Sequence, residues 1–193
     1  MGTKFVTVYN RFLGKITDDM YVELTPQDTV RDLRNLILEA IPGFEFPRCN
    51  LYDYEIAQMV KNQDELEDED FVMGILWDEL DSDVLDDAPP AMVECSTFNA
   101  TLTSEEVNIL ALLMMCAWLQ RQVTSIENVR MKYSGSDFKM TSQANHLSKL
   151  LALLEECQRQ SLHMQRLYKR RKLSSDGRYE SNWSSLAEVS ALE

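Results

Sequence analysis

Residues 22–37 read Val-Glu-Leu-Thr-Pro-Gln-Asp-Thr-Val-Arg-Asp-Leu-Arg-Asn-Leu-Ile, and this stretch carries most of the information about the fold. Val22 and Leu24 fall on one face of an extended chain, which predicts a strand. A turn is expected at Pro26, and Thr29 is expected to cap the helix that follows. Apolar residues recur at helical spacing and predict the buried face of that helix: Val30, Leu33, Ile37 and Ala40.

The flanking residues extend this step into a small mixed domain. Residues 5–9, Phe-Val-Thr-Val-Tyr, are aromatic and β-branched and predict a first strand that pairs with residues 22–24 as a hairpin. Pro42 is expected to end the helix, because a residue before proline disfavours the helical conformation. Short strands are predicted at residues 50–54 and 71–77. The predicted element order is therefore ββαββ.

This order, together with the Glu-x-x-Pro-x-Asp-Thr step at residues 23–29, resembles the ubiquitin-like β-grasp fold over about residues 3–78. Proteins of that fold mostly bind other proteins, so the resemblance implies an interaction module rather than a catalyst. No Gly-Gly follows the last expected strand, which excludes conjugation chemistry.

The charge is distributed unevenly, which suggests a division of the chain. Residues 64–87 contain 12 acidic residues and no Lys or Arg. We interpret this stretch as a solvated loop followed by an extended linker, with a docking surface for a basic partner or mimicry of nucleic-acid charge as the alternatives. The expected domains are a β-grasp unit at 1–78, an acidic and Pro-containing linker at 79–95, and a helical unit at 96–193.

The second half predicts two long helices. Thr103 and Glu106 have the spacing of a capping box, so a helix is expected over residues 104–132. That helix is apolar on nearly all sides, and the residues expected to contact partners are Met114, Met115 and Trp118. A second helix at 141–173 carries one apolar stripe: Leu147, Leu150, Leu151, Leu154, Cys157, Ser161, Met164 and Tyr168. The two form a long αα-hairpin, and partner subunits or the first domain must cover the rest of the first helix. The fold class is thus α+β.

Two features near the C-terminus are candidate contact sites. The expected second helix ends in four cations: Lys169, Arg170, Arg171 and Lys172. Cations at this end complement the helix dipole. Alternatively, they contact phosphates, an acidic protein face or a nuclear-import receptor. A short amphipathic tail, too small to fold alone, is expected to dock on this chain or on a partner through Trp183 and Leu186.

A second resemblance covers residues 105–172. The runs Glu-Val-Asn-Ile-Leu-Ala (106–111), Met-Lys-Tyr-Ser-Gly-Ser-Asp-Phe-Lys-Met-Thr-Ser-Gln-Ala-Asn-His-Leu (131–147) and His-Met-Gln-Arg-Leu-Tyr-Lys-Arg-Arg-Lys (163–172) are similar to helical structural proteins of tailed bacteriophages. Such proteins act in the neck, connector or tail assembly. The resemblance implies a subunit of a ring.

No motif for catalysis, cofactor binding or metal binding is present. The chain has no Gly-rich phosphate loop, no G-x-S-x-G and no H-E-x-x-H. Its four cysteines have no zinc-ligand spacing, and we expect reduced thiols that act as small apolar side chains. His146 and His163 are expected on polar helix flanks. No signal peptide is expected, and the apolar run 107–119 is too short to span a membrane.

These observations predict a non-enzymatic structural protein of a tailed-phage virion, acting through protein–protein contacts near the head–tail junction or tail. Its expected partners are other virion proteins or copies of itself in a homo-oligomeric ring, without membrane or nucleic acid. Its expected location is the virion, after assembly in the host cytoplasm. The first alternative is a soluble intracellular adaptor whose ubiquitin-like domain recruits a partner. The second is a DNA mimic or host-takeover inhibitor that uses the acidic stretch.

Overall fold

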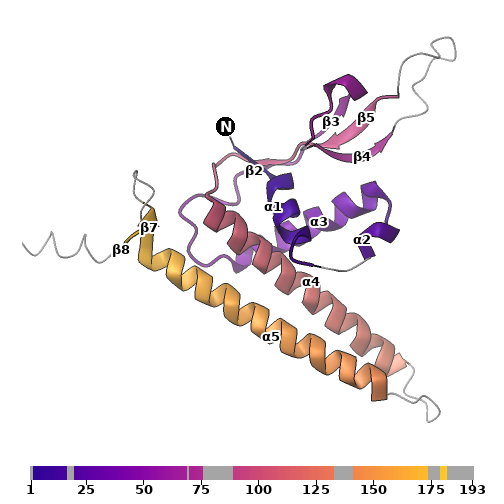
Figure 1. The fold of residues 1–193 in the computed structure, drawn as a ribbon, viewed down its shortest axis with the longest axis vertical. Helices are drawn as coiled ribbons and strands as arrows, with labels where there is room; N and C mark the ends of the chain where they lie inside the picture. Colours follow the sequence, from indigo (N-terminus) through magenta and orange to yellow (C-terminus); the bar gives the residue numbers. More distant parts are fainter. Residues whose placement is uncertain are drawn as a thin grey trace, which may run out of the picture.

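The computed structural model describes residues 2–16, 20–68, 70–75, 89–132, 141–173 and 179–181. The described helices are α1 (Phe5–Leu13), α2 (Met20–Glu23), α3 (Pro26–Ala40), α4 (Ser104–Lys132) and α5 (Thr141–Arg170), with 3-10 turns η1 (Ile41–Gly43) and η2 (Gln63–Glu65). The described strands are β1 (Thr3–Lys4), β2 (Tyr54–Glu55), β3 (Gln58–Lys61), β4 (Phe71–Ile75), β5 (Ala91–Glu94), β6 (Thr97–Phe98), β7 (Arg171–Leu173) and β8 (Tyr179–Ser181). The fold is α+β, as expected, with long helices and small antiparallel sheets (Figure 1).

The two strands predicted for the N-terminal hairpin are wrong. Residues 5–9 begin helix α1, and residues 20–23 form the short helix α2. In α1, the rings of Phe5, Tyr9 and Phe12 recur at i, i+4 and i+7 and are all fully buried. Burial of this helical stripe outweighs the strand preference of individual aromatic and β-branched residues, which depends strongly on context.

Helix α3 was predicted correctly, but its cap was misplaced. Thr25 is the N-cap, its Oγ1 accepting a hydrogen bond from the backbone N–H of Asp28 at 3.2 Å, and Pro26 occupies the first helical position. Thr29 instead lies inside the helix and is buried. The expected apolar face is buried, and the helix ends at Ala40 before the turn that contains Pro42.

One strand of the larger sheet lies in the segment that was expected to be a linker. Its strand order is β3-β5-β4, all antiparallel, so β5 is the central strand. Residues 91–94, predicted to belong to a linker at 79–95, are therefore hydrogen-bonded on both sides. The predicted strand at 71–77 is confirmed for Phe71–Ile75, whereas only Tyr54 of the predicted strand at 50–54 lies in a strand. Residues 76–88, with much of the acidic stretch, lie outside the described residues.

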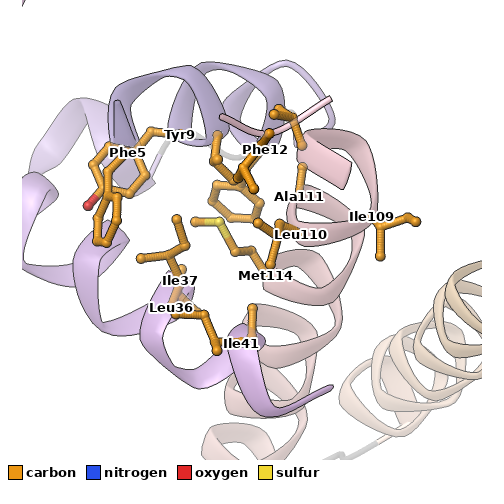
Figure 2. Close-up of a cluster of buried hydrophobic side chains, with 14 of the residues drawn as sticks. Phe5, Tyr9, Phe12, Leu36, Ile37, Ile41, Ile109, Leu110, Ala111 and Met114 are labelled. Carbon is orange, nitrogen blue, oxygen red and sulfur yellow. The ribbon is translucent and has the colours of Figure 1, made fainter. Parts of the chain in front are cut away.

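The core crosses the expected domain boundary. Helix α4 lies at its centre and packs against α1, α3 and α5 (Figure 1). Phe12 of α1 and Ile37 of α3 enclose the same cluster as Met114 of α4 (Figure 2). Arg121 of α4 adds ion pairs to two α3 carboxylates, Asp32 at 2.9 Å and Glu39 at 2.6 Å. The first half of the chain thus supplies the neighbours that α4 needs, so residues 1–78 and 96–193 do not have separate cores.

Helices α4 and α5 lie side by side, with α5 running back along α4 (Figure 1). The apolar stripe predicted on α5 is mostly buried against α4, although Leu151 is exposed. Among the described residues, Ser104–Ile126 of α4 is the one helical stretch long and apolar enough to cross a membrane. In this fold the stretch is the central helix of the core, where Leu110 and Met114 are fully buried.

Candidate functional site

The residues predicted to contact partners from α4 belong to the interior. Met114 is fully buried, and Met115 and Trp118 are half-buried. Trp118 packs against both apolar clusters, one formed with α1 and α3 and the other formed with α5. Met114 therefore offers no contact surface, since α1, α3 and α5 cover most of this helix, and a partner contact at Met115 and Trp118 stays a prediction.

Two of the four cations at the end of α5 make contacts within the chain. Arg171 pairs with Glu105 of α4 at 2.9 Å between Nη2 and Oε1. The Lys169 ammonium lies 3.8 Å from the ring centroid of Phe46, a cation–π contact. Arg170 is exposed. The side chain of Lys172, and the tail residues Trp183 and Leu186, lie outside the described residues.

A buried polar network joins the same end of α5 to α4. The capping box predicted at Thr103 forms, with Glu106 Oε2 accepting from the Thr103 N–H at 2.7 Å. Tyr168 of α5 donates its hydroxyl hydrogen to the other oxygen of Glu106. Arg48 stacks over the Tyr168 ring at 4.1 Å and donates to the Tyr168 carbonyl at 2.7 Å. The Gln165 side chain also accepts a hydrogen bond from the Glu45 N–H and donates one to the Gly43 carbonyl. No local sequence signal marks Arg48 or Gln165 as a member of this network.

A second buried polar group lies between the helices and the sheet. Arg34 of α3 donates a hydrogen bond to Glu94 of β5, whose side chain is completely buried. The hydroxyl of Tyr9 is buried beside this pair, and both its burial and the Glu94 carboxylate raise the pKa of Tyr9. This charge pair fixes β5, and with it the sheet, against the helices.

Four exposed apolar side chains lie on this sheet or just before it, and they are distributed over both of its faces. This set of residues, called here the sheet surface, is between 44% and 54% exposed: Ile56, Met59, Val60 and Ile75. Strand β3 is an edge strand, and within the described residues no strand pairs with its outer side. Met59 and Val60 are adjacent on β3 and so point to opposite faces of the sheet. An edge strand with exposed apolar side chains is a typical protein-binding feature.

A different exposed surface lies on α5. Leu151, Arg159, Leu162 and Arg166, called here the α5 surface, fall within about 80° of arc at 3.6 residues per turn, and all four are exposed. Three of them border a cavity of about 690 Å³ between α5, α4 and the end of α1. Its remaining lining includes Asn108, Leu112, His163, Met164 and Lys15, whose pKa is lowered by burial and by the nearby Arg11. The lining of the cavity therefore combines cationic and apolar side chains.

The described residues contain no candidate metal site. No three His, Cys, Asp or Glu side chains gather as a metal-ligand set within the part of the chain that the structure describes. His146 and His163 are both exposed, as expected from their helix positions. No protein-family model matches this chain, and comparisons with curated proteins and with solved structures also found no match.

Proposed function

We propose that this protein is a non-enzymatic assembly protein whose copies join head to tail, the sheet surface of one copy binding the α5 surface of the next. The observation that carries the proposal is the presence of two unlike exposed surfaces on separate elements, since the sheet of β3, β5 and β4 and helix α5 lie on opposite sides of α4 (Figure 1). A head-to-tail contact between two different patches builds a ring when its rotation closes.

The charges around the two surfaces are complementary. Residues 51–75 contain eight Asp and Glu and one Lys. The α5 surface itself carries two cations, Arg166 and Arg159, of which Arg159 also pairs with Glu156 at 2.7 Å. Asp64, Glu65 and Glu67 beside the sheet surface are exposed. Opposite charges around two apolar patches steer association and fix its orientation.

The cavity beside the α5 surface also suits such a contact. Its lining combines the cations Arg159 and Arg166 with the apolar side chains of Leu112 and Met164. An exposed Val60 or Met59 flanked by carboxylates presents the matching chemistry. The apolar contact would provide most of the affinity, and the charged rim would provide specificity.

The proposed setting is the head–tail junction or tail of a tailed phage, as the sequence resemblance of residues 105–172 implies. We do not base the function on a ubiquitin-like module, because residues 5–13 and 20–23 are helical where that fold has its first two strands. The alternative of a monomeric adaptor predicts a different stoichiometry and is separated by the following experiment.

Sedimentation velocity of the full chain at micromolar concentration tests the contact. We expect an oligomer that weakens near 1 M salt, where the screening length is only about 3 Å. Val60→Glu should give monomer, whereas Tyr52→Glu, which introduces the same charge at a 66% exposed residue outside the sheet surface, should not. Likewise Arg166→Glu should dissociate the oligomer, and Lys149→Glu, on another side of α5, should not. A wild-type monomer at every salt concentration would replace this proposal with the adaptor.

The virion setting has a separate test. Peptide mass spectrometry of purified phage particles from cells that carry the gene should detect the chain in several copies per particle. If the purified particles do not contain the chain, the virion setting fails even when the purified chain is oligomeric.

A further inference from the structure

Two thiols from different helices meet in the interface between α4 and α5. The Sγ atom of Cys116 lies 3.0 Å from the Sγ atom of Cys157, although 41 positions separate the two residues in the sequence. Both cysteines are free in this structure. A disulfide needs its sulfur atoms at about 2.05 Å, so the two thiols must approach each other by only about 1 Å.

The two thiols differ in accessibility. Cys157 is only 3% exposed, packs among Leu119 and Leu154, and donates its S–H to the Leu112 carbonyl at 3.5 Å. Cys116 is half-buried and so is open to a small reagent. One reachable thiol beside one shielded thiol is the arrangement of an attacking and a resolving cysteine.

The electrostatics support the same order of attack. The hydrogen bond between the two thiols lowers the pKa of Cys116, whereas it raises the pKa of Cys157, as does burial. Burial raises the pKa of the two remaining cysteines, Cys49 and Cys95. Because the thiolate is the nucleophile, Cys116 should react first.

We propose that Cys116 and Cys157 are a redox modification site, which forms a reversible intramolecular disulfide by exchange with a small-molecule disulfide such as glutathione disulfide. The Cys116 thiolate attacks one sulfur of glutathione disulfide, forms a mixed disulfide and releases the first glutathione thiolate. Cys157 then attacks Cys116 Sγ, and its proton passes to the second glutathione, which leaves as a thiol. The protein dithiol loses two electrons and two protons, and one glutathione disulfide becomes two thiols.

The bond would join α4 to α5 where they leave the shared core. Beyond Cys116, residues Leu119 and Val123 pack on Leu147 and Leu154 of α5, without a buried residue from α1 or α3 in that cluster. The disulfide would close a loop that contains the whole connection between the helices. This inference is independent of the proposed assembly function, because it concerns the α4–α5 interface inside one copy.

The test is a thiol titration of the full chain in glutathione buffers of increasing oxidised fraction. After alkylation in denaturant, peptide mass spectrometry should find Cys116 disulfide-bonded to Cys157 while Cys49 and Cys95 are still alkylated. Cys157→Ser should accumulate a glutathione adduct on Cys116, and Cys116→Ser should leave Cys157 alkylated. Oxidation of Cys49 or Cys95 at the same buffer ratio, or an adduct on Cys157 in Cys116→Ser, would overturn the proposal.

A second measurement asks whether the native helices accommodate the bond. Oxidised wild-type protein should melt about 5–15 °C above reduced protein, from the loop-closure entropy and the usual melting response of a chain of this size. Cys116→Ser should melt at the same temperature in both buffers. An equal or lower melting temperature after oxidation of the wild type would overturn a disulfide within the native fold.

Discussion

The buried pair of Arg34 and Glu94 should be one of the most sensitive points of this fold. The Glu94 side chain is completely buried, whereas the Arg34 side chain keeps 18% of its surface exposed. Removing Arg34 therefore leaves a carboxylate without its counter-charge and without access to water. We expect Arg34→Ala to lower the free energy of unfolding by about 3–5 kcal/mol, the usual range for breaking a buried pair.

The reverse change should cost less. In Glu94→Ala the guanidinium that is left behind can reach solvent, so we expect a loss smaller by about 1 kcal/mol. Replacing both residues, as Arg34→Met with Glu94→Leu, removes both desolvation penalties and should restore most of the stability. The matched control is Arg31→Ala, which removes the same residue type from an exposed position of the same helix.

Urea unfolding followed by circular dichroism measures these differences. With a slope of about 2 kcal/mol per molar urea, Arg34→Ala should lower the midpoint by about 1.5–2.5 M, and Arg31→Ala should leave it nearly unchanged. Equal losses in Arg34→Ala and Arg31→Ala would refute the reasoning. So would a double variant that is less stable than Arg34→Ala alone.

Three further predictions follow from the described contacts. Leu33→Ala should lower the free energy of unfolding by about 2–5 kcal/mol, because Leu33 is fully buried. Asn35→Ala, at an exposed position of the same helix, should lower it little. Equal shifts in melting temperature for the two variants would contradict this packing. Burial raises the pKa of Tyr9 and of Tyr168, so the folded state holds protons that the unfolded state releases near pH 10. These two groups should leave the free energy of unfolding unchanged below about pH 10 and lower it above that pH by about 1.4 kcal/mol per pH unit for each tyrosine. Tyr9→Phe should reduce this dependence on pH, as measured by urea unfolding at several pH values. An unchanged dependence would contradict the raised pKa of Tyr9. Residues 96–193 expressed alone should aggregate, because the face of α4 that packs on α1 and α3 is then exposed; a monomeric, folded fragment by sedimentation would show that this face needs no cover.

Local sequence signals predicted the elements whose burial pattern is periodic. Helix α3 and helix α4 were anticipated from apolar spacing, and the capping box at Thr103 forms as its residue types indicate. For helix α1 the two signals disagree. The aromatic and β-branched composition of residues 5–9 favours a strand, whereas the spacing of Phe5, Tyr9 and Phe12 is helical, and the helix is what forms. Composition is the weaker guide when a segment packs on a helix of the core.

Long-range pairing was beyond any local signal. Strand β5 follows a Pro-Pro pair and was assigned to a linker, yet it pairs with β3 and β4 on its two sides. Nothing near Glu94 in the sequence indicates that its carboxylate is buried against Arg34, 60 positions away. The same holds for Arg48 and Tyr168, which are 120 positions apart. The sheet surface depends on this pairing, because only the strand order makes β3 an edge.

The shared core has a direct consequence for the proposed assembly. A head-to-tail ring closes only when each copy presents its two contact surfaces at a fixed angle. Two domains on an extended acidic linker would not fix that angle. Here the sheet is tied to α3 by the Arg34–Glu94 pair, α3 packs on α4, and α4 packs on α5. Each step is a buried contact, so the sheet surface and the α5 surface belong to one continuous body. The residues that fix the angle between copies would therefore lie in the core, away from both contact surfaces.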